Sequence, residues 1–113
     1  MATMELKNMQ VWVDDEEGTF RRWSGEEWEV IVQEFDGFAY ILRLDVEGPH
    51  RGKGLGTAIV QTLKDIYGTL IASPASERSR GFFAKLGVED ERGELKGQAI
   101  WPLDQGYGVF IVE

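Results

Sequence analysis

The segment from residue 48 to residue 56 limits the fold most strongly, because four glycines and one proline in nine residues do not form a regular helix or strand. The apolar run FAYILRLDV at 38–46 comes just before it and is predicted to be a buried strand. After it, a helix is predicted to start near Thr57, which is either its N-cap or in its first turn, and to end near Tyr67. The apolar residues of this helix fall on one face: Ile59, Val60 and Leu63.

Short strands are predicted on both sides of this strand–loop–helix unit. Asp36-Gly37 is a strong hairpin signal between two apolar runs. A second helix is predicted from residue 76 to residue 86, ended by Gly87. The predicted strands lie at 9–13, 20–23, 27–35, 38–46, 69–72, 99–101 and 109–112. Strands that alternate with helices in this way predict an α/β domain of the α+β type, built around one sheet.

Length and residue usage exclude several classes of protein. The 113 residues suit one domain, residues 1–113, and hold no cysteine, so disulfides and a cysteine nucleophile are excluded. The single histidine, His50, excludes a two-histidine metal site, and we expect no metal. No apolar run is long enough to cross a membrane, and the first ten residues lack a secretory signal pattern. We therefore expect a cytoplasmic protein without a membrane partner.

The formal net charge of −8 is spread unevenly along the chain. Residues 1–42 carry −7, residues 43–85 carry +3, and residues 86–113 carry −4. A basic middle between acidic flanks suits an anionic ligand held centrally, although chance clustering on a solvated surface explains it equally well. A nucleic-acid partner is disfavoured, because phosphate contacts need a broad basic surface.

The glycine-rich loop has the physical character of a phosphate-binding turn. Glycines let the backbone approach a ligand closely, and successive backbone amides next to a helix N-terminus attract anions. The Walker pattern and the dinucleotide pattern GxGxxG both fail here. A structural turn that holds no ligand is the alternative. The residues that would form the binding turn are Arg51, Gly52, Lys53, Gly54, Leu55, Gly56 and Thr57.

Two motifs resemble the GNAT superfamily of N-acetyltransferases. The segment RGKGLG at 51–56 resembles the family's acyl-CoA motif [QR]-x-x-G-x-[GA], and SERSRGFFAKLGV at 76–88 resembles its N-x-x-A-x-x-L-Y-x-x-x-G-F segment. The resemblance covers about residues 38–88, the expected acyl-CoA-binding core. It implies a single mixed, mostly antiparallel sheet with flanking helices. The first 37 residues are too few for the family's usual pair of N-terminal helices, so a minimal version of the fold is expected.

The resemblance also implies a chemistry. The strand that ends at Val46 is expected to bulge and to splay from the next strand, with pantetheine on the backbone near Leu44 and Val46 and pyrophosphate on the loop amides. Acetyl-CoA is the implied cosubstrate, and a primary amine attacks its thioester directly. The acceptor amine belongs to a small molecule, a protein lysine or a protein N-terminus. Glu47 and Asp45 are the candidate bases, and His50 is a weaker one.

This sequence departs from the family pattern at two positions. The family's tyrosine, which often protonates the leaving thiolate, is matched by Phe83, and its asparagine by Ser76, which is expected near the cofactor. Tyr107 is a candidate substitute for the missing phenol. These departures keep a second function open, namely a non-catalytic acyl-CoA-binding or protein-interaction module on the same fold. Homodimerisation through a sheet edge or an apolar patch is a further expectation.

Overall fold

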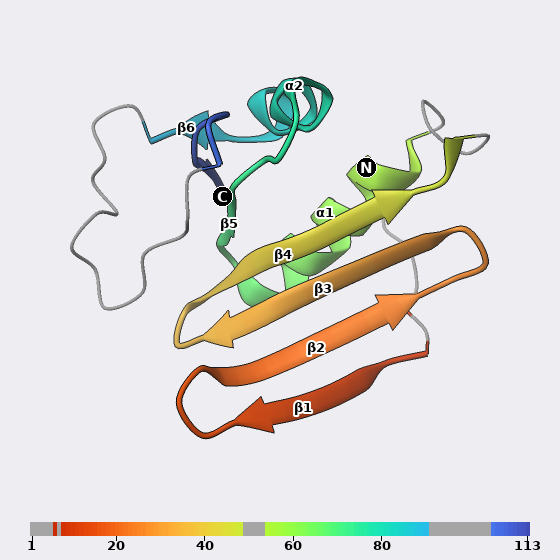
Figure 1. Cartoon of the computed structure of the whole chain (residues 1–113), viewed down its shortest axis with the longest axis vertical. Coiled ribbons are helices and arrows are strands. Elements are labelled where there is room, and N and C mark those ends of the chain that lie inside the picture. The colour runs from red at the N-terminus through yellow and green to blue at the C-terminus, as the bar shows by residue number, and fades with distance from the viewer. Residues whose placement is uncertain (1–5, 7, 49–53, 91–104) are drawn as a thin grey trace.

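The two ends of the chain contribute strands to one seven-stranded sheet, in the order β1-β2-β3-β4-β5-β7-β6 (Figure 1). The computed structural model describes residues 6, 8–48, 54–90 and 105–113. The strands are β1 (Gln10–Asp14), β2 (Gly18–Ser24), β3 (Trp28–Phe35), β4 (Phe38–Val46), β5 (Leu70–Ala72), β6 (Val88–Glu89) and β7 (Phe110–Val112). The helices are α1 (Leu55–Tyr67) and α2 (Glu77–Leu86). Neighbouring strands in this order are hydrogen-bonded to each other, which gives six pairs among the described strands. The β4–β5 pair is parallel and the other five are antiparallel. The predicted mixed, mostly antiparallel sheet is confirmed.

Strands β1 to β4 form an antiparallel meander, because each tight turn returns the chain beside the strand just completed. The Asp36-Gly37 hairpin is confirmed: Phe35 pairs with Phe38, and Gly37 has a φ of 86° that few other residues adopt. In the acidic turn between β1 and β2, the Asp14 carboxylate accepts hydrogen bonds from the backbone amides of Glu16 and Glu17, at 2.8 and 2.9 Å. The turn residues are therefore fixed by backbone contacts.

Helix α1 covers one face of β4 and β5, and its apolar side chains form the centre of the core. Ile59, Val60 and Leu63 are fully buried there, as their spacing predicts. The helix begins at Leu55, earlier than the sequence suggests, because Gly54 takes the left-handed conformation at φ 82° and starts the helix without a side-chain cap. Thr57 lies in the first turn and is not the N-cap.

Helix α2 packs beside β7 and closes the other end of the core. Ser76 caps it, with its Oγ accepting a hydrogen bond from the Ser79 amide at 3.1 Å. Gly87 ends it where the backbone passes very close to β7, since an added Cβ would lie 2.4 Å from the Ile111 carbonyl oxygen. The two-residue strand β6 that follows is absent from the sequence prediction. The predicted strand at 99–101 lies outside the described residues.

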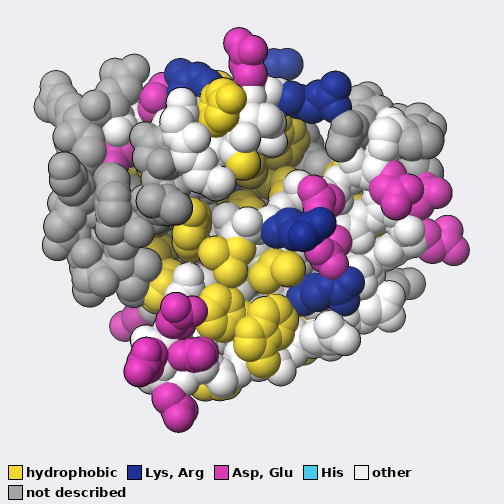
Figure 2. Space-filling model, in the orientation of Figure 1, with side chains coloured by type: hydrophobic (Ala, Val, Ile, Leu, Met, Phe, Trp, Pro, Cys, Tyr) yellow, Lys and Arg dark blue, Asp and Glu magenta, His cyan; other side chains and the backbone are white. Residues whose placement is uncertain are grey.

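The sheet face opposite α1 is turned toward the viewer in Figure 1, and over β1 to β3 no described helix covers it. Figure 2 shows hydrophobic side chains gathered on this face between basic and acidic side chains. Two stacked aromatic pairs belong to the meander: Trp12 of β1 with Phe20 of β2, and Phe35 of β3 with Phe38 of β4. This open face agrees with the expectation that the first 37 residues form strands only. Neither described helix is long and apolar enough to span a membrane.

Candidate functional site

Strands β4 and β5 run parallel for three residues and then separate. Their pairing ends where Ile41 lies beside Ala72, the last residue of β5, while β4 continues to Val46. The separation coincides with a β-bulge, because Arg43 and Ile41 pair with consecutive residues of β3 and leave Leu42 as the extra residue. A bulge bends the strand that carries it. The bulged and splayed strand expected from the family resemblance is therefore present.

Beyond the bulge, β4 directs alternate backbone groups toward the gap that β5 leaves. The Glu47 amide donates to the Glu27 carbonyl of the β3 side at 2.9 Å, which fixes the phase of the antiparallel ladder. In such a ladder, alternate residues direct their N–H and C=O groups toward the neighbouring strand. The groups of Leu44 and Val46 therefore point away from β3, into the gap.

A groove of about 170 Å³ occupies this gap. One wall is the outer half of β4, and the other comes from the end of β5, the segment after it, and α2 (Figure 1). The lining residues are Ile41, Leu42, Arg43, Leu44, Asp45, Ala72, Ser73, Pro74, Ala75, Ser79, Phe83 and Gln105. The walls combine apolar side chains with hydroxyl, amide and charged groups, and such a mixed lining suits a small-molecule site.

One polar atom of the groove lacks a partner. The Ser73 Oγ is buried without a hydrogen bond among the described residues, whereas its backbone carbonyl accepts one from the Gln105 amide at 3.0 Å. A buried hydroxyl that makes no hydrogen bond is unfavourable. The hydroxyl and the backbone of Leu44 both belong to the lining of the groove and are its candidate hydrogen-bonding groups for a ligand.

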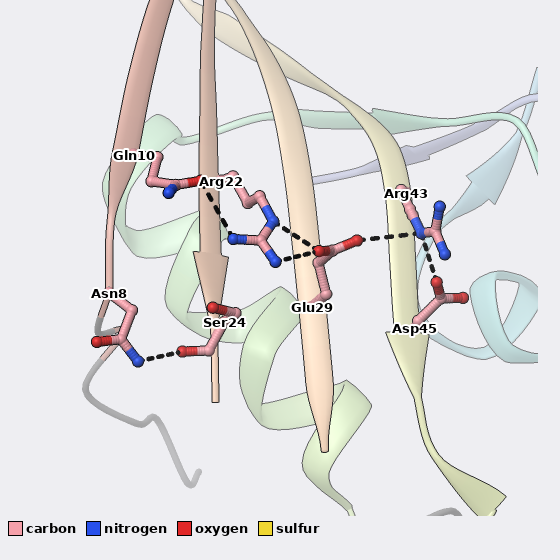
Figure 3. A network of polar contacts seen from close by, with 7 residues as sticks. All are labelled: Asn8, Gln10, Arg22, Ser24, Glu29, Arg43 and Asp45. Atoms are coloured by element: carbon pink, nitrogen blue, oxygen red, sulfur yellow. Dashed lines mark hydrogen bonds and ion pairs between the residues drawn. The ribbon is translucent and has the colours of Figure 1, made fainter. Parts of the chain in front are cut away.

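Charged side chains form a network on the open face of the sheet, at the rim of the groove (Figure 3). Glu29 lies between two arginines, with oxygen–nitrogen distances of 2.5 Å to Arg22 Nη2 and 3.1 Å to Arg43 Nε. Arg43 also pairs with Asp45. The hydrogen bond and charge of Asp45, followed by the charge of Glu29, raise the pKa of Arg43 above its usual value. Asp45 is thus held as an ion pair at the groove.

Of the predicted site residues in β4 and directly after it, only some line the groove. Leu44 and Asp45 line the groove, and Val46 is half-buried against the core. Glu47 is exposed, one residue beyond β4, and does not line the groove. Because the bulge at Leu42 precedes both carboxylates, it does not place Asp45 and Glu47 on different faces.

The predicted phosphate-binding turn is described only in part, since Arg51, Gly52 and Lys53 lie outside the described residues, as does His50. Gly54, Leu55, Gly56 and Thr57 form the start of α1. Gly56 serves helix packing, because an added Cβ would lie 3.3 Å from the ring of Phe82 on α2. A Cβ on Gly54 would meet open space, so its positive φ is what requires glycine there.

Ser76 and Tyr107, which were expected to take the places of the family's asparagine and tyrosine, do not line the groove. Ser76 caps α2 and bonds Ser79, but Ser79 lines the groove and Ser76 does not. Tyr107 is partly exposed outside the groove lining, and its carbonyl accepts a hydrogen bond from Arg80 at 2.9 Å. Phe83 is buried and does line the groove, so the ring lies where the family motif carries a phenol but offers no proton.

Four of the polar or charged groove residues were not predicted: Arg43, Ser73, Ser79 and Gln105. Ser79 falls on the alanine position of the second family motif, and Ser73 directly follows an apolar strand, which is a usual place for site residues. Gln105 carries no local signal, because it reaches the groove only through the return of the chain to β7. In the described part of the chain no cluster of three or more acidic or histidine side chains is arranged to hold a metal.

Solved structures with the same fold support this description. A GNAT-family acetyltransferase of Staphylococcus aureus Mu50 matches with a TM-score of 0.65 at 12% identity, covering 83% of this chain and 66% of its own. A Klebsiella pneumoniae protein assigned as an acyl-CoA N-acyltransferase matches with a TM-score of 0.58 at 12% identity, covering 88% of this chain and 73% of its own. A Bacteroides thetaiotaomicron protein assigned to the GNAT family matches with a TM-score of 0.54 at 16% identity, covering 86% of this chain and 62% of its own. The chain thus spans about two thirds of the length of these structures.

The sequence itself matches a family model. No curated protein is similar enough to count as a relative. The model that describes the acetyltransferase (GNAT) family, however, matches residues 10–88, from the start of β1 to the start of β6. The matched range contains the splayed strands, the glycine loop and both helices. The chain belongs to the GNAT family of acetyltransferases.

Proposed function

We propose that this chain transfers the acetyl group of acetyl-CoA to a primary amine by direct attack in a ternary complex. The observation that carries the proposal is the groove at the β4–β5 separation, which Leu44 lines and where the buried Ser73 hydroxyl makes no hydrogen bond to the described residues. These groups suit the amides and the thioester of an acyl-CoA arm. The start of α1, with the loop before it, supplies amides and positive charge for the pyrophosphate.

The reaction balances without a covalent enzyme intermediate. The neutral amine forms a C–N bond to the acetyl carbon, the C–S bond breaks, and CoA leaves as its thiolate. The proton that the nitrogen loses on becoming an amide passes through water to that thiolate, which becomes the thiol. A backbone amide near Val46 supports the carbonyl oxygen as negative charge develops on it. The groove contributes chiefly by holding the thioester and the amine in attack geometry.

The carboxylates at the end of β4 receive the proton of the incoming ammonium. Glu47 is exposed and makes no side-chain hydrogen bond to the described residues, which leaves it able to accept a proton through water. Asp45 is paired with Arg43, so we assign it the attraction and orientation of the cationic acceptor. Among the described residues, the groove holds serine hydroxyls but no phenol for the leaving thiolate.

Calorimetric titration with acetyl-CoA, CoA and ATP in parallel tests the cofactor. We expect micromolar-class binding of acetyl-CoA, about 8 kcal/mol, and little response to ATP. Thiol release is then measured with four acceptors: a lysine peptide, a peptide with a free N-terminus, a polyamine and a small aromatic amine. Absence of acetyl-CoA binding in a folded sample would overturn the proposal.

Variants of the acidic residues test the assignment of the base. Glu47→Gln is expected to lower turnover by about 100-fold or more with acetyl-CoA binding unchanged, the size typical of a lost general base. Asp45→Asn is expected to raise KM for a cationic acceptor more than it lowers kcat. Glu16→Gln, in the turn at the opposite end of the sheet, is the control and should change neither. Unchanged turnover in Glu47→Gln would remove Glu47 as the base.

A second function is supported by one observation. Phe83 fills the groove position where the family pattern has tyrosine, and Tyr107 does not line the groove. This favours a non-catalytic module that binds acyl-CoA on the same fold. Tight acetyl-CoA binding without thiol release for any acceptor would support the module over the enzyme.

A further inference from the structure

Strand β1 is a bare edge of the sheet. It is the first strand in the sheet order, so β2 is its one neighbour among the described strands, and all five of its residues are exposed. Natural edge strands are usually protected by lysine, proline, a bulge or a covering segment. The β1 sequence, QVWVD, has neither lysine nor proline, and its pairing with β2 is regular over its whole length.

The three central side chains of β1 are apolar and exposed, and they lie on both faces of the sheet. Val11 and Val13, on the α1 face, are 46% and 68% exposed, and Trp12 on the open face is 42% exposed. Trp12 stacks on Phe20 of β2, its direct cross-strand partner, with ring centroids 5.5 Å apart. The edge thus combines backbone groups that no described strand pairs with a half-exposed aromatic row, and an unprotected edge of this kind is a template for another strand.

We propose that β1 pairs antiparallel with β1 of a second copy of this chain, about a two-fold axis at Trp12, and so joins the two sheets into one. This register is the one that pairs all five residues of both strands. It places Trp12 beside its own symmetry mate and Val11 beside Val13 of the second copy. The aromatic row then continues across the axis on the open face, and cross-strand aromatic and β-branched pairs of this kind stabilise sheets.

The polar ends of β1 are complementary in the same register. Gln10 of one copy faces Asp14 of the other. The Gln10 Oε1 accepts a hydrogen bond from Arg22 Nη1 at 3.2 Å, which leaves its amide NH₂ to donate to that carboxylate. The turn amides hold the pKa of Asp14 below its usual value, so it is ionised. A register centred on Asp14 would instead oppose two like charges, which is unfavourable.

The remaining structure leaves room for a second sheet. Helix α1 packs against β4 and β5, on the far side of the meander from β1 (Figure 1). A strand added beyond β1 therefore meets none of the described helices. The contact is small, and interfaces below about 1,200 Å² are usually weak. Each copy also carries a charge of −8, so salt, which screens the repulsion, should strengthen the association.

Sedimentation velocity over a range of protein and salt concentrations tests the proposal. The unmodified chain is expected to shift from monomer to dimer as its concentration rises, at lower concentration in high salt. Val13→Lys is expected to abolish the shift, because it puts a charge on the paired edge while its exposed position leaves the monomer folded. The matched control is Val88→Lys, also on an edge strand and 73% exposed, which should dimerise normally.

Disulfide trapping tests the register separately. Because the chain has no cysteine, Trp12→Cys introduces a single thiol, which the proposal places beside its own symmetry mate. Mild oxidation is expected to give a covalent dimer of Trp12→Cys and little of Gln10→Cys, whose mates lie several residues apart. A monomer at all concentrations, a dimer that survives Val13→Lys, or equal trapping at the two positions would overturn the proposal.

Discussion

Replacing Ser73 with alanine is expected to stabilise the ligand-free protein while weakening its binding of acetyl-CoA. The hydroxyl is buried in the groove and makes no hydrogen bond to the described residues, and an unsatisfied buried polar group costs about 1–3 kcal/mol. Taking the lower end, Ser73→Ala should raise the free energy of unfolding by about 1 kcal/mol, which is about 4 °C in Tm for a domain of this size. One lost hydrogen bond to the ligand, about 0.5–1.5 kcal/mol, should weaken the Kd about 2- to 10-fold.

The matched comparison is Ser76→Ala, the same chemical change three residues further on. Ser76 Oγ accepts the capping hydrogen bond from the Ser79 amide, so its loss should destabilise the protein by about 1 kcal/mol. Urea denaturation of the ligand-free variants gives both free energies, and calorimetry gives the Kd of Ser73→Ala. The reasoning is refuted if Ser73→Ala destabilises the protein as Ser76→Ala does, or if it binds acetyl-CoA as tightly as the unmodified chain.

Three further predictions concern backbone geometry and pH. Gly87→Ala should cost several kcal/mol in urea denaturation, because its Cβ would lie 2.4 Å from the Ile111 carbonyl oxygen; a cost near zero would contradict the close approach. Gly54→Ala should cost about 1 kcal/mol and Gly54→Asn less, since asparagine tolerates a positive φ; equal costs would contradict that cause. Burial, then the hydrogen bond to Glu34, raises the pKa of Tyr67. Above about pH 10 Tyr67 loses its proton in the unfolded chain while it keeps the proton in the folded protein, which favours unfolding. Stability should therefore fall with rising pH, less steeply in Tyr67→Phe.

Local sequence signals predict the parts of the fold that local interactions determine. The Asp36-Gly37 turn and the helical spacing of Ile59, Val60 and Leu63 each specify their element from a few neighbouring residues, and both are confirmed. The start of α1 is less predictable, because Gly54 begins it through its backbone conformation and leaves no side-chain signal. Strand β6 has no sequence signal of its own, since its two residues become a strand only by pairing with β7.

The groove is less predictable than the fold, because its walls come from separate parts of the chain. The family resemblance identified Phe83 and Leu44, and its place near the end of the predicted strand identified Asp45. Ser73 and Gln105 meet there through a hydrogen bond between residues more than thirty positions apart, which no local pattern encodes. Tyr107 has glycine neighbours that resemble a site loop, but its backbone, rather than its phenol, makes the contact with Arg80.

The arrangement of strands has a consequence for the order in which the chain folds. The meander β1 to β4 forms from neighbouring segments, so little loop-closure entropy is lost at each step. Strand β7 must instead return to pair Val112 with Leu70, a distant contact of the kind that slows folding. Gln105 reaches the groove through this return to β7, so the groove is complete only when the distant contact has formed. A nascent or partly folded chain should therefore hold a formed meander before it can bind acyl-CoA.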